Sequence, residues 1–158
     1  MGRTLELLAK AFAFAGGAVF VVMIGMSATS IASRTLLGRP LPGDFELVQL
    51  GCAIGVAAFL PWCQMRRGNI IVDFFTARLS PRAQSLLDAV GALLLALVMA
   101  LVAWRASAGA ISVYESGERA MISRYPQWIG YAAIVPPLAL TAIAGFYTAW
   151  QSLRKAVR

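Results

Sequence analysis

The sequence predicts an all-α integral membrane protein with four transmembrane helices. Its apolar stretches contain almost no ionisable side chain, and each is long enough to cross a bilayer, which takes about 20 apolar residues. The chain is 59% hydrophobic and only 13% charged, whereas a soluble domain carries about 25% charged residues. The apolar stretches are residues 11–33, 47–65, 89–114 and 125–153. They use most of the 158 residues, so we expect a single membrane domain over residues 1–158.

The first span is expected over about residues 11–33. Its apolar run is longer than the roughly 7–15 residues of a signal-peptide core, so we expect it to remain in the protein as a helix. Residues 34–46 then connect it to the second span. This connection contains Gly38-Arg39-Pro40-Leu41-Pro42-Gly43, whose prolines and glycines break any helix.

The second span is expected over about residues 45–65. Glu46 opens it, where the positive end of the helix dipole favours a carboxylate. Gly51 and Gly55 lie one turn apart and, with Ala58, let another helix approach closely. That helix belongs either to this chain or to another subunit.

The connection from Arg66 to Ser80 is too polar to span but carries several large apolar side chains. Over residues 69–79 it suits a short amphipathic helix lying in the inner interface, or alternatively a turn buried against other helices. Asp73 lies near Arg66, so we expect it to form a local ion pair or a cap. Ser80 and Pro81 resemble an N-cap followed by proline at the first helical position, which predicts that the third helix starts there.

The third and fourth spans are expected over about residues 86–110 and 127–151. A third helix from Pro81 to about Val113 is longer than the bilayer is thick, so it tilts or projects. Pro136-Pro137 remove backbone donors near the middle of the fourth span and predict a kink. Arg105 is the one charge that interrupts the apolar stretches. It lies about one turn from the outer end, and it either snorkels to the interface or pairs with an acid of this or another chain.

Lysine and arginine positions predict the orientation. With the N-terminus inside, nine of them lie in inner segments and five in outer ones, which favours both termini in the cytoplasm. Trp62 and Trp150 then lie near the inner interface, and Trp104 and Trp128 near the outer one, as aromatic belts require. The net charge of +7 gathers mainly at the inner face, where anionic lipids are, so nucleic acid is not an expected partner.

The residue types exclude most active-site chemistry. The chain has no histidine, so a serine or cysteine nucleophile lacks its usual base. Cys52 and Cys63 lie about 16 Å apart along one helix, too far for a disulfide, and without histidine they do not suggest a zinc or haem site. No acid lies within the apolar stretches to relay protons. We therefore expect neither an enzyme nor a cofactor.

Three motifs carry a family resemblance. They are Pro42-Gly43-Asp44-Phe45-Glu46-Leu47-Val48, then Met65-Arg66-Arg67-Gly68-Asn69-Ile70-Ile71-Val72-Asp73-Phe74 followed by Leu79-Ser80-Pro81-Arg82, and finally Tyr125-Pro126-Gln127-Trp128-Ile129. In this order on a chain of this length, they resemble the small membrane subunit of tripartite ATP-independent periplasmic (TRAP) transporters, the DctQ-like family. Many members have histidine where Asn69 stands, so the resemblance assigns no role to that side chain.

The resemblance implies sodium-driven uptake of organic acids across a bacterial or archaeal cytoplasmic membrane. In such transporters a periplasmic binding protein delivers the substrate, and a large membrane subunit carries the substrate and sodium sites. The small subunit packs against the static scaffold of the large one and helps to receive the binding protein. The candidate interface or structural residues are then Glu46, Gly51, Gly55, Arg66, Asp73 and Arg105, and the candidate docking residues are Arg39, Glu115 and Glu118.

Other functional classes fit the sequence less well. A self-sufficient small transporter needs a charged group at depth, and a membrane enzyme needs a nucleophile with its base. A haem-binding respiratory subunit lacks the usual histidine ligand. A purely structural accessory subunit of another membrane complex, such as a respiratory chain, is the remaining alternative.

Overall fold

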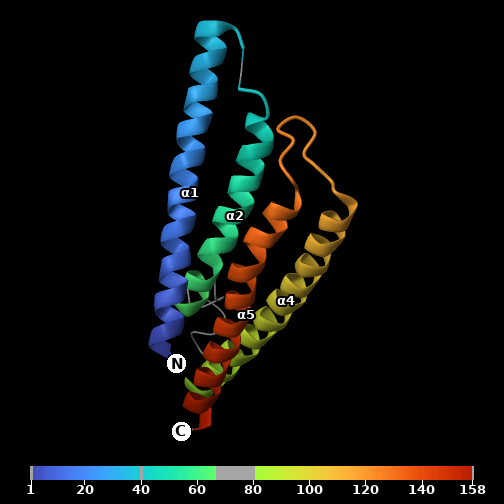
Figure 1. The fold of residues 1–158 in the computed structure, drawn as a ribbon. Helices are drawn as coiled ribbons and strands as arrows, with labels where there is room; N and C mark the ends of the chain where they lie inside the picture. Colours follow the sequence, from blue (N-terminus) through green and yellow to red (C-terminus); the bar gives the residue numbers. More distant parts are fainter. Residues whose placement is uncertain (1, 40, 67–80, 158) are drawn as a thin grey trace.

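Four long helices make up the computed structural model, which describes residues 2–39, 41–66 and 81–157 (Figure 1). The helices are α1 (Gly2–Leu37), α2 (Asp44–Met65), α4 (Pro81–Ser116) and α5 (Trp128–Val157). All four are long and apolar enough to cross a membrane. The prediction of an all-α protein with four spans is therefore confirmed. The segment 69–79, expected to form an interfacial helix, lies outside the described residues.

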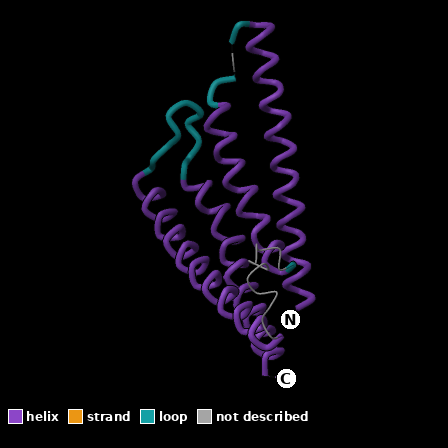
Figure 2. The backbone as a smooth tube through the Cα atoms, turned by 180° about the vertical axis from the view of Figure 1, so that it is seen from behind, coloured by secondary structure: helices purple, strands orange, loops and turns teal. Residues whose placement is uncertain are grey.

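The helices lie side by side in the order α1, α2, α5, α4 (Figures 1 and 2). The last helix of the chain is thus inserted between the second and the third. Its buried side chains include Pro137, Thr141 and Thr148, and it has the largest buried share of the four spans. In contrast, α1 packs mainly on α2, and α4 mainly on α5. The arrangement is an open row in which the flanking helices, α1 and α4, each have one main neighbour.

Two helices extend well beyond their apolar stretches. Both α1 and α4 contain 36 residues, which corresponds to about 54 Å and exceeds the ~30 Å hydrocarbon core. The α4 helix starts at Pro81, as predicted, and ends before Gly117, whose φ of +67° is typical of a helix C-terminus. The α1 helix begins at Gly2, earlier than the apolar pattern suggested, because Glu6, Leu7 and Lys10 are good helix formers.

Small residues bring α1 and α2 together. A Cβ atom added to Gly55 would lie 2.5 Å from Phe20 Cε2, and one added to Gly51 would overlap the side chain of Met23. Conversely, a Cβ atom on Gly16 would lie 2.9 Å from the Cβ atom of Ala58. Each helix therefore receives side chains of the other where it has no side chain of its own, which allows close van der Waals packing.

A stripe of alanines joins α4 to α5. The buried hydrophobic residues of α4 are Ala89, Ala96 and Ala103, spaced seven residues apart on one face. This is the repeat that keeps one seam of a helix on its neighbour. A Cβ atom on Gly145 of α5 would lie 2.8 Å from the Cβ atom of Ala96 and 3.1 Å from its Cα atom. The backbones of α4 and α5 thus approach so closely that a methyl group would not fit.

The α5 helix continues through Pro136 and Pro137, where the sequence predicts a kink. Both prolines lie inside the helix, and Pro137 is fully buried. The hydroxyl of Thr141 donates a hydrogen bond of 2.7 Å to the carbonyl oxygen of Pro137. This bond lies in the turn after the prolines, whereas the carbonyl groups that lose their helical donors are those of Ala132 and Ala133, four residues before each proline.

The α4–α5 seam can be tested with two glycine substitutions. Gly145→Ala forces Ala96 and its backbone away, and we expect it to destabilise the protein by about 1–3 kcal/mol. Gly91→Ala is the matched control, because no atom lies within 4 Å of a Cβ placed there and both positions are helical. Thermal unfolding in detergent measures the difference. Equal melting temperatures for the two variants would contradict the close approach.

Candidate functional site

The carboxylate of Glu46 joins the start of α2 to the connection between α4 and α5. It accepts hydrogen bonds from the backbone N–H groups of Ile122 (3.1 Å) and Ser123 (2.9 Å), and from the hydroxyl of Ser123 (2.5 Å). Charge-assisted bonds of this kind are about twice as strong as neutral ones. Glu46 therefore does more than complement the helix dipole, which was the reason the sequence suggested for it.

Gly43 makes the same contact possible through its lack of a side chain. Its φ of +77° lies in the left-handed region that glycine adopts without strain. A Cβ atom at this position would also lie 2.8 Å from the Cβ atom of Ser123 and 3.2 Å from its Cα atom. The α1–α2 connection and the α4–α5 connection therefore touch at backbone distance.

Asp44 fastens α1 to the same point. The buried hydroxyl of Ser30 donates a hydrogen bond of 2.5 Å to Asp44 Oδ2 and accepts one of 3.4 Å from the N–H of Leu41. The other carboxylate oxygen accepts the N–H of Phe45 at 2.7 Å. We call Ser30, Gly43, Asp44, Glu46 and Ser123 the outer network. It links α1, α2 and the α4–α5 connection at one end of the bundle, measured along the helix axes.

The α4–α5 connection, residues 117–127, folds into a narrow hairpin. The N–H of Ala120 donates to the carbonyl of Tyr125 (3.0 Å), and the N–H of Gln127 donates to that of Glu118 (3.2 Å). The side chains of Met121 and Ile122 at its tip are 92% and 62% exposed. Because Glu46 holds the backbone of Ile122, the hairpin presents two apolar side chains from a fixed position.

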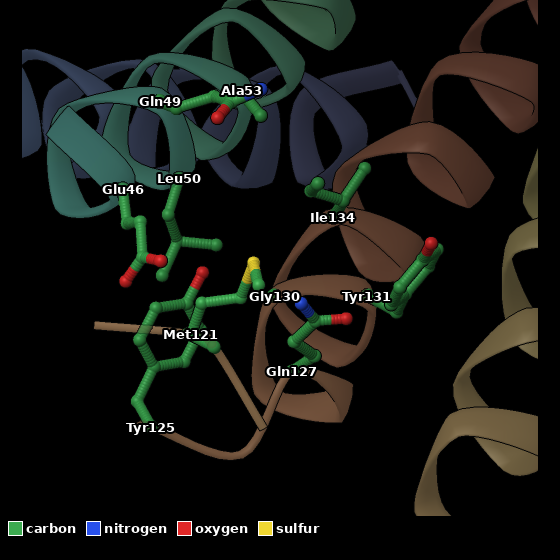
Figure 3. A pocket seen from close by; sticks show the side chains of 11 residues that line it. Glu46, Gln49, Leu50, Ala53, Met121, Tyr125, Gln127, Gly130, Tyr131 and Ile134 are labelled. Atoms are coloured by element: carbon green, nitrogen blue, oxygen red, sulfur yellow. The ribbon is translucent and has the colours of Figure 1, made fainter. Parts of the chain in front are cut away.

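A cavity of about 400 Å³ lies between α2, α5 and the hairpin (Figure 3). Glu46 and Leu50 of α2 point toward Met121 and Tyr125 of the hairpin, and Gln127 is the last hairpin residue before α5 (Figure 3). Its wall mixes carboxylate, amide and phenol groups with apolar side chains. The lining residues are Glu46, Gln49, Leu50, Ala53, Ala120, Met121, Tyr125, Gln127, Gly130, Tyr131 and Ile134.

A buried polar pair joins α2 to α5 near the opposite end. The side-chain amide of Gln64 donates a hydrogen bond of 2.8 Å to the hydroxyl of Thr148, which donates one of 3.0 Å to the carbonyl of Gly145. Both side chains are buried. The sequence analysis did not single out this pair, although an amide inside an apolar span is itself a signal, because such groups bond to a neighbouring helix.

The sequence-predicted residues of α2 fall into different surroundings. Gly51 and Gly55 face α1, while Glu46 belongs to the outer network. The guanidinium of Arg66 lies 4.6 Å from the ring centroid of Trp62, a cation–π contact at the end of the helix. Asp73 lies outside the described residues.

The predicted docking residues are exposed, and they lie at the same end of the helices as the outer network. Arg39 lies in the α1–α2 connection, where its carbonyl accepts a hydrogen bond of 2.8 Å from the hydroxyl of Ser33. Glu115 lies in the last turn of α4, and Glu118 in the hairpin. Hydrophobic patterning alone does not predict Met121 and Ile122 beside them, because their exposure depends on how the hairpin folds.

Arg105 is exposed on α4, and its side chain makes no hydrogen bond or ion pair within the part of the chain that the structure describes. Among those same residues, no group of three or more His, Cys, Asp or Glu side chains could hold a metal ion. Cys52 and Cys63 are free thiols of intermediate exposure on α2. The arrangement thus offers contacts and charges for association, with its polar groups gathered mostly near the ends of the helices.

Comparison with known proteins gives one family. The family model described as the DctQ component of tripartite ATP-independent periplasmic transporters matches residues 23–155. The match runs from the middle of α1 almost to the end of α5, and it includes the outer network and the hairpin. No curated protein and no solved structure matches the chain.

The contact between Glu46 and the hairpin is open to direct test. Glu46→Gln replaces a charged acceptor with a neutral amide, whose hydrogen bonds are weaker, and we expect a less stable protein with faster hydrogen exchange over residues 117–127. Glu115→Gln is the control, since the side chain of Glu115 makes no hydrogen bond or ion pair among the described residues. Hydrogen exchange followed by mass spectrometry measures both variants. Similar exchange in the two would show that Glu46 does not hold the hairpin.

The buried pair between α2 and α5 calls for a double-mutant cycle. Gln64→Leu, Thr148→Val and the double variant should show a coupling energy of about 0.6 kcal/mol, and at most roughly 2 kcal/mol, as measured for such bonds in membranes. Thermal or denaturant unfolding in detergent supplies the three values. Strict additivity would mean that the hydrogen bond does not stabilise the α2–α5 contact.

Proposed function

Because the chain belongs to the DctQ component family of TRAP transporters, we propose that it scaffolds the large transport subunit and helps to dock the substrate-binding protein. Members of this family are small membrane subunits of TRAP transporters, and the four helices that the structure describes are long and apolar enough to make this chain a multi-pass membrane protein. The finer role, assistance in sodium-driven uptake of organic acids, is the proposal. Substrate and sodium sites are expected on the large subunit, so this chain needs no cofactor for that role.

The open row of helices is the observation that supports a scaffold best. The flanking helices α1 and α4 each have one main neighbour, so each keeps a broad apolar face free. Large exposed side chains follow both helices, among them Phe14, Val21, Ile24 and Ile31 on α1, and Leu94, Val98 and Leu101 on α4. Exposed apolar area of this extent suits a protein that packs against lipid and against a larger membrane partner.

We infer that both termini face the cytoplasm. Along the helix axes, the N- and C-termini lie at one end of the bundle, and the outer network and hairpin lie at the other (Figure 1). Among the described residues, six lysines and arginines lie near the helix ends that carry the termini and four near the hairpin and the α1–α2 connection; the six are Arg3, Lys10, Arg66, Arg82, Arg154 and Lys155, and the four are Arg34, Arg39, Arg119 and Arg124. In this orientation the hairpin faces the periplasm of a bacterial or archaeal cell, and the protein spans its cytoplasmic membrane.

The hairpin then gives the binding protein a firm place to dock. Its backbone is held by Glu46, so Met121 and Ile122 are displayed with little loss of conformational freedom on binding. Charged side chains on or near it include Glu115, Glu118 and Arg119. An apolar centre with a charged rim is common in protein interfaces, and rim charges mainly raise the rate of association.

Charge reversal at the predicted docking residues tests this role. We expect the triple variant Arg39→Glu, Glu115→Lys, Glu118→Lys to slow association of the purified binding protein by roughly tenfold at low salt, while assembly with the large subunit is retained. Arg82→Glu is the control, because Arg82 lies at the opposite end of α4. Association with the purified membrane complex of the same organism is measured at two salt concentrations.

Two results would overturn parts of the proposal. Unchanged association of the triple variant would remove the docking role of these residues. If the tagged wild-type chain failed to co-purify with the large TRAP subunit, the scaffold role itself would be wrong.

A further inference from the structure

Arg105 lies on the side of α4 that faces away from the rest of the described chain. The buried alanines Ala89, Ala96 and Ala103 face α5, and at 100° per residue Arg105 falls nearly opposite them. Its neighbours on that side are exposed. We call Leu87, Leu94, Val98, Leu101 and Arg105 the Arg105 face, and its four apolar members are 50–59% exposed.

The depth of Arg105 follows from the register between α4 and α5. Tyr114 meets Trp128 edge to face, with ring centroids 5.6 Å apart. Gly109 lies against Tyr131, and Ala96 against Gly145. Because the helices are antiparallel, this register places Arg105 level with Pro136 and Pro137, roughly 12 Å along the axis from Trp128.

This depth differs from the one that the sequence suggests. The apolar pattern puts Arg105 about one turn from the outer end of its span, and Trp104 in the same aromatic belt as Trp128. In the structure α4 continues to Ser116, so Tyr114 shares the level of Trp128, and Trp104 lies ten residues farther inward. Arg105 would have to cover more than its own length to reach the level of Trp128. Snorkelling is therefore a poor explanation for this charge.

The described part of the chain supplies no counter-charge. Arg105 makes no ion pair there, and the acidic residues Glu6, Asp44, Glu46, Asp88, Glu115 and Glu118 all lie near helix ends or in connections. A charge inside a bilayer is costly and is usually paired within a protein. The partner must then come from outside these residues.

We propose that the Arg105 face binds a transmembrane helix of the large TRAP subunit, and that Arg105 pairs there with an aspartate or glutamate at matching depth. A guanidinium suits this task because its planar fork binds a carboxylate through two hydrogen bonds. The inference rests on the proposed scaffold role and adds to it the helix and the residue that make the contact.

Charge also argues against a second copy of this chain on the same face. A two-fold symmetric pair of α4 helices, parallel to each other in the membrane, would bring the two Arg105 side chains together. Like charges at such a contact are unfavourable. The exposed apolar side chains of α1 offer a less specific surface, since its apolar run contains no ionisable residue.

The main test replaces Arg105 by leucine in the tagged chain, co-expressed with the large TRAP subunit of the same organism. Arg105→Leu keeps the face apolar, so the chain itself should fold, which its elution as a single species in detergent would verify. We expect roughly tenfold less co-purified large subunit, because the carboxylate of the partner is left unpaired. Arg105→Lys should retain part of the complex, and Arg82→Ala, on the same helix near its inner end, should retain all of it.

Photo-crosslinking identifies the occupant. With benzoylphenylalanine in place of Leu101, we expect a crosslink to one helix of the large subunit. Neutralising the acidic residue on that helix should then restore assembly with Arg105→Leu, because an unpaired carboxylate no longer remains.

Several outcomes would overturn the inference. Crosslinking only to a second copy, or only to lipid, would do so, as would wild-type yields of complex with Arg105→Leu. In these cases the wild-type chain would still co-purify with the large subunit, and the proposed function would stand. Failure of the wild-type chain to co-purify would instead remove the proposed function itself.

Discussion

The fold of this small TRAP subunit depends on close helix contacts at glycine and alanine positions. In a bilayer, apolar helices gain nothing by leaving lipid for one another, so association needs close packing and a few hydrogen bonds. Gly16 and Gly55 provide the packing between α1 and α2, and Ala96 and Gly145 provide it between α4 and α5. Methyl groups added at these glycines would push backbones or bulky side chains apart.

Polar side chains also join the helices to one another near both ends of α2. At one end, Asp44 and Glu46 occupy the first turn of α2 and reach in different directions, toward Ser30 of α1 and toward Ser123 of the hairpin. Near the other end, Gln64 and Thr148 join α2 to α5. Central α2 and α5 are thus fastened at both ends, whereas the faces of α1 and α4 that point away from the row stay free. A joined centre with free flanks suits the scaffold role that we propose.

The position of the charges follows the same logic. Asp44 and Glu46 have their hydrogen-bond needs met within the chain, so they serve its own structure. Arg105 makes no such contact among the described residues, and it lies on an exposed face at the level of Pro136 and Pro137. A satisfied charge stabilises the protein that carries it, whereas an unsatisfied one at depth calls for a partner. This difference separates the structural acids from the residue that we assign to assembly.

The sequence by itself determined that the chain is a four-span helical membrane protein, because twenty-residue apolar runs have no other stable state in lipid. It also located the start of α4 at Pro81 and pointed to Glu46, Gly51 and Gly55, since local rules govern proline, helix dipoles and small residues. The tertiary structure alone decided the order α1, α2, α5, α4, the contact of Glu46 with Ser123, the buried pair of Gln64 and Thr148, and the depth of Arg105. These features depend on which residues of distant segments lie at the same level, and hydrophobic periodicity contains no information about that register.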